Sequence, residues 1–143
     1  MVLLDANLLI YAYHAEQEQH AEARAWLERT FAGAEPIGLP WQTVLAFLRI
    51  TTHNRIFERP LSMAKAQRIA ASWLDQPQVH AIAAGPHFFS VLSTLLASAQ
   101  IRGPLVTDAA LAALAIENGA TLCTTDRDFA RFPGLKWVNP LRK

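Results

Sequence analysis

The sequence holds a single cysteine, Cys123, and no apolar run approaches the roughly 18 residues that a membrane span needs. One cysteine excludes a disulfide framework and a cysteine-based metal site. Cys123 lies inside an apolar strand pattern and is predicted to be an inert core residue, because buried cysteine behaves as a small hydrophobe. The start of the chain also lacks the basic segment of a signal peptide, since Asp5 interrupts its apolar run and Glu16 and Glu18 follow. We therefore expect a cytoplasmic protein.

Charged residues are also scarce, at 17% of the 143 residues, whereas apolar residues make up 52%. This balance argues against intrinsic disorder and is typical of a compact globular chain. A chain of this length buries about two-thirds of the surface that it exposes when unfolded, which is sufficient for one domain. We predict a single domain over residues 1–143.

The net charge of +1 conceals an uneven distribution of the 13 basic and 12 acidic residues. Residues 1–35 hold six of the acids but only two of the bases, so the rest of the chain is mildly basic. This distribution is compatible with a polyanionic partner that is attracted by local potential. Ordinary solvated surface charge is the preferred explanation, so charge alone does not assign a nucleic-acid ligand.

Short apolar segments alternate with amphipathic helical segments along the chain. This order predicts an α/β fold of three layers, in which helices cover both faces of a mainly parallel central sheet. The predicted strands are 1–4, 37–39, 79–82, 121–125 and 136–138, and the predicted helices are 7–13, 18–31, 41–53, 62–75, 87–102 and 107–118, with a helical turn at 129–132.

Helical spacing also predicts which side chains are buried. The segment 41–53 carries an apolar stripe that is predicted to be core: Trp41, Val44, Leu45 and Leu48. Trp26 and Trp73 also fall at core spacing in their helices. None of these three tryptophans is therefore expected to serve as a platform for stacked nucleotide bases.

Aspartates fall at three junctions between predicted strands and helices. Asp5 follows the first strand, Asp126 follows the strand 121–125, and Asp108 falls in the first turn of the helix 107–118. The positive end of a helix dipole favours a carboxylate there. Ligands of open α/β sheets bind outside the carboxyl ends of the strands, which is where Asp5 and Asp126 are placed. Each aspartate alone is explained as a helix cap or N-terminal charge, but the three together indicate a shared site.

Converging carboxylates raise one another's pKa, and a bound divalent cation removes this conflict. Oxygen ligands without cysteine or histidine suit Mg²⁺ or Mn²⁺. Such an ion polarises a phosphodiester and lowers the pKa of a bound water for in-line attack. The predicted reaction is therefore metal-assisted phosphodiester hydrolysis, with Asp5, Asp108 and Asp126 as catalytic and metal-binding residues.

A second, mostly polar stripe follows the segment 41–53 and comprises Gln42, Ala46, Arg49 and His53. Arg49 and His53 lie one turn apart, and Arg55 begins a basic loop. These three residues are candidate phosphate contacts, and an exposed polar face with no ligand is the alternative.

Three segments in order, LLDANLLIYAY, LAFLRITTHNRIF and VTDAALAALAIENGATLCTTDRDFARFPGLKWVNPL, resemble the PIN-domain ribonucleases, specifically the VapC-like toxins of bacterial toxin–antitoxin pairs. The resemblance covers essentially the whole chain and implies a PIN-like fold. By this resemblance Asp5, Asp108 and Asp126 match acidic metal-site positions of the family, and Asp128 is a candidate auxiliary acid. The small polar residues that flank the family's site correspond to Asn7 and Thr125.

The resemblance further implies an endoribonuclease that cleaves single-stranded or structured RNA with Mg²⁺ or Mn²⁺ as its cofactor. It also implies a homodimer and a cognate antitoxin whose C-terminal segment blocks the active site. Arg49, His53 and Arg55 then become candidate RNA contacts. Because RNA sequence is mostly read in unpaired loops, a stem-loop target is expected.

One position departs from the family pattern. Members usually carry a glutamate on the helix that begins here at Trp41, and the matching residue is Ala46. Glu117 does not replace that acid, because it lies nine residues after Asp108 and about 13 Å along the same helix. A site with fewer acids is expected to hold one ion instead of two, or to bind its ion weakly until an RNA phosphate completes the coordination.

Two other functions fit parts of the sequence. The alanine at position 46 favours a catalytically weak PIN domain that acts by binding RNA or its antitoxin. A phospho-acceptor signalling domain also places aspartates at strand ends, but it normally has adjacent acids after the first strand and a lysine at a late strand end. This chain has DAN after Leu4 and no lysine between Lys65 and Lys136, which argues against that class.

Overall fold

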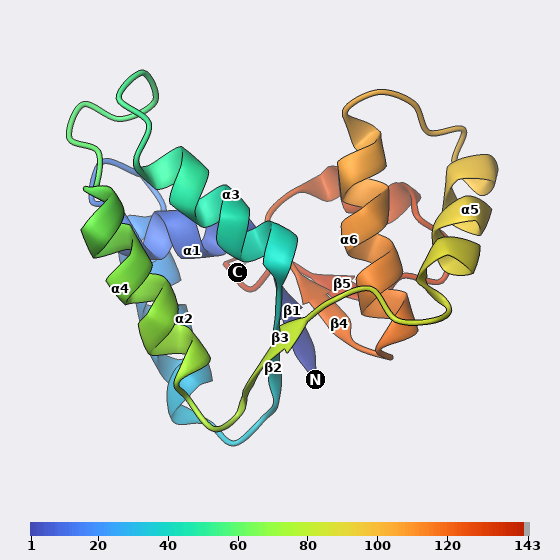
Figure 1. The fold of residues 1–143 in the computed structure, drawn as a ribbon, viewed down its shortest axis with the longest axis horizontal. Helices are drawn as coiled ribbons and strands as arrows, with labels where there is room; N and C mark the ends of the chain where they lie inside the picture. The colour runs from blue at the N-terminus through green and yellow to red at the C-terminus, as the bar shows by residue number, and fades with distance from the viewer. Residues whose placement is uncertain (142–143) are drawn as a thin grey trace.

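The computed structural model describes residues 1–141 and has a five-stranded sheet in which all paired strands are parallel (Figure 1). The order across the sheet is β3-β2-β1-β4-β5. The strands are β1 (Val2–Leu4), β2 (Ile37–Pro40), β3 (Val79–Ile82), β4 (Thr121–Cys123) and β5 (Trp137–Val138). The strand nearest the N-terminus is therefore the central one, and its carboxyl end lies between those of β2 and β4.

Six α-helices and one 3₁₀ helix are described over residues 1–141, and they cover both faces of the sheet (Figure 1). One face packs against α1 (Ala6–Tyr13), α2 (His20–Ala32), α3 (Trp41–Thr51) and α4 (Met63–Leu74). The other face packs against α5 (Phe88–Ser98), α6 (Leu105–Glu117) and the 3₁₀ helix η1 (Arg127–Arg131). This arrangement confirms the predicted three-layer α/β fold.

The two hydrophobic cores follow from the alternation of side chains along the strands. Leu4 and Cys123 belong to the core beneath α1 to α4, whereas Leu3 and Leu122 belong to the core beneath α6. Successive residues of a strand point to opposite faces, so a short strand of leucines supplies both cores at once. Cys123 is 3% exposed, which confirms its predicted burial, and desolvation raises the pKa of its thiol to about 12.

The predicted helices and strands are present, but several of them end at an earlier residue than predicted. The helix α3 ends at Thr51 instead of His53, and the hydroxyls of Thr51 and Thr52 at this end donate to carbonyls one turn back, Phe47 O and Leu48 O. The helix α5 ends at Ser98 instead of Arg102, and Gln100 follows in the left-handed region with φ of 52°. The strand predicted at 121–125 ends at Cys123.

The predicted buried face of α3 is wrong at Trp41 and Leu45, whereas Val44 is buried and Leu48 packs partly buried against the core, as predicted. Trp41 is 47% exposed and Leu45 is 61% exposed, whereas the residues of α3 that are buried are Thr43, Val44, Phe47 and Thr51. The two threonines bury their hydroxyls at little cost because each donates to a backbone carbonyl, Thr43 to Leu4 O at 2.8 Å and Thr51 to Phe47 O at 2.6 Å. Thr43 and Thr51, whose hydroxyls are hydrogen-bonded, thus lie in the core, where the spacing of apolar residues had predicted larger side chains. Trp73 is buried and Trp26 packs partly buried against the same core, as predicted.

Across residues 1–141, none of the helices combines the length and the apolarity that crossing a membrane requires.

Gly38 of β2 lies against the side chains of Leu3 and Ile82, which leave no room for a larger residue. A Cβ built there would lie 2.8 Å from Leu3 Cδ1 and 3.0 Å from Ile82 Cγ1, and both of those side chains are buried. We therefore expect Gly38→Ala to lower the free energy of unfolding by about 1–3 kcal/mol through overpacking, measured by urea denaturation. Gly33→Ala is the matched control, because its Cβ would meet only carbonyl oxygens at 3.5 and 3.7 Å. Equal unfolding midpoints for the two variants would contradict the packing argument.

Candidate active site

Asp5 leaves the central strand and caps the helix that follows. Its Oδ1 accepts a hydrogen bond from the backbone N–H of Ala6 at 2.7 Å, and its Oδ2 accepts one from the hydroxyl of Thr124 at 2.7 Å. Burial raises the pKa of the Asp5 carboxyl, and the negative charge of Asp126 adds to this effect, whereas the two hydrogen bonds oppose it. The side chain is thus fixed in orientation by both of its oxygens.

Thr124 joins Asp5 to Asp126. Its side chain is fully buried, and its hydroxyl donates to Asp5 Oδ2 while accepting from the backbone N–H of Asp126 at 3.1 Å. Thr124 was not among the predicted site residues, which included its neighbour Thr125. The local signal was available, because a threonine two residues before an aspartate can accept from that aspartate's N–H in a turn.

Thr125 instead pairs with Asn7, and the bond joins the segment that follows β4 to α1. The Nδ2 of Asn7 donates to the hydroxyl of Thr125 at 2.8 Å. The Oδ1 of Asn7 is buried and has no hydrogen-bond partner among residues 1–141. The two residues predicted to flank the site therefore contact each other directly, beside Asp5 and Asp126.

Asp108 lies in the first turn of α6, as predicted. Its pKa is raised to about 6, chiefly by burial and then by the charges of Asp126, Asp5 and Asp128, with Arg131 opposing. The three predicted site aspartates therefore lie close enough to disfavour one another's ionisation. The fold brings Asp5, Asp108 and Asp126 into one electrostatic cluster, although more than a hundred residues separate the first two.

Asp126 and Asp128 open the short helix η1. The Oδ1 of Asp126 caps this helix by accepting from the backbone N–H of Asp128 at 2.9 Å. Asp128 is exposed, and its carboxylate lies 3.6 Å from the guanidinium of Arg131. Asp128 thus contributes charge from the rim of the cluster.

A cavity of about 470 Å³ opens beside the cluster between α3 and α6. Asp5 and Asp108 line it, together with Gln42, Ala46 and Arg49 of α3. Gln42 Nε2 also donates to the backbone oxygen of Thr107 at 3.3 Å, which links the two helices at the cavity mouth. The position of Ala46 in this wall agrees with the expectation that a family acid is missing there.

Only one of the three candidate RNA contacts reaches this cavity. Arg49 lines it, whereas His53 and Arg55 belong to the turn after α3. The Nδ1 of His53 accepts from the backbone N–H of Arg55 at 3.1 Å. Because α3 ends at Thr51, His53 and Arg55 do not lie on the same helix face as Gln42, Ala46 and Arg49.

The donor chemistry of the cluster fits a hard divalent cation. Its side-chain donors are carboxylate oxygens. The pKa of Asp5 and that of Asp108 are raised chiefly by burial and then by neighbouring carboxylates, and a bound cation would counter both effects. Over the described residues, no group of three or more His, Cys, Asp and Glu side chains is placed closely enough to hold a metal ion by itself. The residues suited to hold an ion are Asp5, Asp108 and Asp126, with further oxygens needed from outside the protein.

Glu117 is engaged elsewhere, as expected. Its carboxylate oxygens accept from the backbone N–H groups of Gly85 at 2.8 Å and His87 at 2.9 Å, which ties the end of α6 to the start of α5. A Cβ at position 85 would lie 2.5 Å from Glu117 Oε2, so a larger residue there would displace the Glu117 carboxylate from these two N–H groups.

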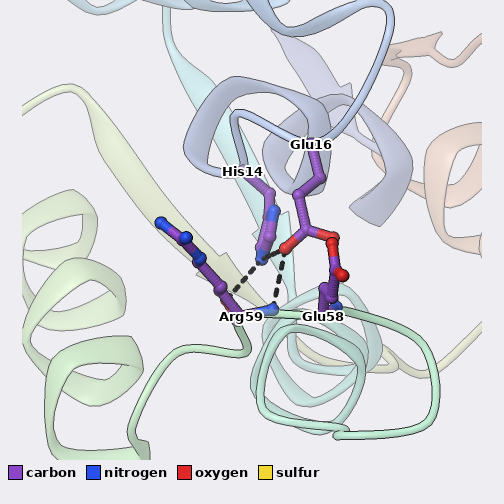
Figure 2. A network of polar contacts seen from close by, with 4 residues as sticks. All are labelled: His14, Glu16, Glu58 and Arg59. Atoms are coloured by element: carbon purple, nitrogen blue, oxygen red, sulfur yellow. Dashed lines mark hydrogen bonds and ion pairs between the residues drawn. The ribbon is translucent and has the colours of Figure 1, made fainter.

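A second cavity, of about 440 Å³, lies between the loops after α1 and α3, but its polar groups serve as a tether (Figure 2). Glu16 accepts from the backbone N–H groups of Glu58 and Arg59, which lowers the pKa of the Glu16 carboxyl. His14 Nε2 lies 3.0 Å from the backbone oxygen of Arg59, and the His14 ring stacks on Phe57. These contacts hold two loops together, so the acidic cavity is the candidate active site.

The PIN domain family matches residues 2–135, a span that contains every aspartate of the cluster. The chain belongs to the PIN domain family. Ribonuclease VapC33 of Mycobacterium tuberculosis is 41% identical over 143 residues, with 100% of both chains covered. The protein is thus a VapC-like PIN domain.

Solved structures show the same fold. The likeness to VapBC2 of Rickettsia felis, solved with a promoter DNA fragment, has a TM-score of 0.68 at 18% identity and covers 97% of this chain and 98% of that one. The likeness to VapC20 of Mycobacterium tuberculosis, described as a toxin that cleaves the sarcin–ricin loop, has a TM-score of 0.69 at 15% identity and covers 95% and 99%.

The raised pKa of Asp108 predicts a pH-dependent stability. Its folded pKa of about 6 exceeds the ordinary 3.8, so the folded state binds the proton more tightly and stability falls as pH rises from about 4 to 6. Asp108→Asn removes this penalty. After discounting for solvent screening, we expect the variant to be more stable than the parent by about 1 kcal/mol at pH 7 and equally stable near pH 4.

Urea denaturation at the two pH values measures this difference. Glu18→Gln is the control, because Glu18 is exposed and lies outside the cluster, and it should show no such pH-dependent gain. A gain for Asp108→Asn that is equal at both pH values would contradict the electrostatic origin.

Proposed function

We propose that this PIN domain is a metal-dependent RNA endonuclease that acts as the toxin of a toxin–antitoxin pair. The observation that carries the proposal is the cavity in which Asp5 and Asp108 meet, with Asp126 in the same electrostatic cluster. The relatives support it, since the protein that matches over its full length at 41% identity is named a ribonuclease. The proposed location is the cytoplasm.

The residues have distinct roles in the proposed reaction. A divalent cation of the Mg²⁺ or Mn²⁺ class, held by Asp5, Asp108 and Asp126, would polarise the phosphodiester and acidify an attacking water. Thr124 orients Asp5 through the bond to its Oδ2. Arg49 lines the opposite wall and would neutralise a backbone phosphate that enters the cavity. In the hydrolysis that such a site would support, a P–O bond forms to the water oxygen as one P–O bond of the RNA backbone breaks, and the leaving ribose oxygen takes up a proton from solvent.

The proposal includes a cognate antitoxin whose C-terminal segment blocks the cavity, and a homodimer. A chain of the toxin–antitoxin complex from Klebsiella pneumoniae has a similar fold, with a TM-score of 0.66 at 20% identity, which supports the first of these. The homodimer is supported by Phe89 of α5, which is 73% exposed and would be covered by a second copy of the chain. The substrate class is RNA with unpaired bases, in line with the stem-loop expectation.

A second candidate function is favoured by Ala46. The cavity wall presents a methyl group where an acid would add a metal ligand, so a PIN domain that binds RNA or antitoxin without rapid cleavage also fits. Cleavage by the purified, antitoxin-free protein with Mn²⁺ separates the two functions.

Removing the cluster's carboxylates should abolish cleavage. We expect Asp5→Asn and Asp108→Asn each to slow the cutting of a stem-loop RNA by at least about 100-fold, because each loses a metal ligand that stabilises the transition state. Chelation should do the same, and added Mg²⁺ or Mn²⁺ should restore the parent. The readout is mapping of the new 5′ ends.

Asp128→Asn is the matched control for these variants. It removes an acid of the same cluster that is exposed and paired with Arg131, so its cleavage rate should stay within about tenfold of the parent. Unchanged cleavage by Asp5→Asn would refute the proposed chemistry.

Restoring an acid at position 46 should strengthen metal binding. We expect Ala46→Glu to tighten Mn²⁺ binding about tenfold or more, since a further carboxylate would line the same cavity. Calorimetric titration measures the affinity and the number of ions, with Ala46→Gln as the uncharged control. Equal affinity in the glutamate and glutamine variants would show that position 46 does not face the ion.

A further inference from the structure

The outward face of α3 carries an aromatic, an aliphatic and a cationic side chain in one row. Trp41, Leu45 and Arg49 follow one another at intervals of four residues, so they share one side of the helix. All three are exposed, Trp41 at 47% and Leu45 at 61%. We name this row the α3 face. Leu45 and Arg49 also line the acidic cavity, so the face leads directly into it.

This face is held rigidly in place by the side chains next to it. Thr43 donates to the backbone oxygen of Leu4, the residue before Asp5, and Gln42 donates to the backbone oxygen of Thr107, the residue before Asp108. The start of α3 is thereby anchored to both sides of the cavity. A side chain presented on such an anchored helix loses little conformational freedom when a ligand covers it.

We infer that the α3 face binds an unpaired stretch of RNA that leads into the acidic cavity, with a base stacked on Trp41 and a phosphate on Arg49. This inference rests on the proposed function. Every base has a π-face, so an exposed tryptophan captures unpaired RNA without needing a particular sequence. Trp41 would thus bind a base of the substrate, which the carboxylates of the aspartate cluster cannot do.

Charge favours RNA over an apolar partner at this face. Over residues 1–141, Arg49 takes part in none of the ion pairs, so its guanidinium is available to an anionic ligand. A partner that covered only Trp41 and Leu45 would leave this cation unpaired at the edge of the contact. An RNA strand matches both properties of the row, because it offers bases for Trp41 and phosphates for Arg49.

The experiment measures RNA binding without cleavage. Fluorescence anisotropy would follow a fluorescein-labelled oligoadenylate and an abasic analogue of the same length, with chelator present so that nothing is hydrolysed. We expect Trp41→Leu to bind oligoadenylate roughly 5- to 100-fold more weakly than the parent, and Trp41→Phe to stay close to the parent. The abasic analogue should bind the parent and Trp41→Leu equally, because it has no base to stack.

Arg49→Ala provides the complementary control. It should weaken both probes and reduce the slope of log affinity against log salt by about one, as expected for the loss of a phosphate contact. Melting temperatures of the Trp41 variants should match the parent, since the side chain is half exposed and its removal leaves the core intact.

Each outcome decides between partners. If the parent binds neither probe, the inference fails, and the cleavage assay with Asp5→Asn decides the proposed function separately. If the parent binds and Trp41→Leu binds oligoadenylate equally well, only the inference fails. If Trp41→Leu lowers the molecular mass in solution, measured by light scattering, the face belongs to a second copy of the chain and the inference is overturned.

Discussion

The candidate site depends on the parallel pairing of β1 with β4. This pairing sets Leu4 against Cys123, so the residues that follow the two strands emerge side by side. The hydroxyl of Thr124 then reaches Asp5 and the backbone of Asp126 together. Because β1 is the central strand, its end is walled by α3 on one side and α6 on the other. A sheet with β1 at an edge would leave Asp5 with only one such wall.

The acidic cluster is unfavourable for the fold that contains it. Burial raises the pKa of Asp5 and Asp108, and the neighbouring carboxylates raise both further. A domain selected only for stability would avoid this arrangement, whereas local electrostatic conflict is typical of functional sites. The protein relieves part of the conflict with hydrogen bonds from Ala6 and Thr124. A bound cation would relieve the remainder, which is the physical reason that oxygen-rich clusters and hard cations occur together.

The helix α3 shows how polar residues reorganise a hydrophobic pattern. Apolar spacing assigned Trp41 and Leu45 to the core, but Thr43 and Thr51 lie there with their hydroxyls bonded to carbonyls. The helix is rotated relative to the prediction, and this rotation turns an aromatic and an aliphatic side chain outward beside the cavity. The wall that faces Asp5 then presents Ala46 and Arg49.

Local sequence was sufficient for the order of strands and helices, the three-layer class and the placement of Asp5 and Asp108 at element ends, because hydrophobic periodicity and capping are encoded within a few residues of each element. It also indicated burial of Cys123. Only the tertiary structure decided that Thr124 rather than Thr125 contacts Asp5, that Arg49 reaches the cavity without His53 or Arg55, and that Trp41 is exposed. The reason is that each of these depends on which partner a hydroxyl or a helix face meets across the sheet, and such partners lie 39 to 119 residues away in the chain.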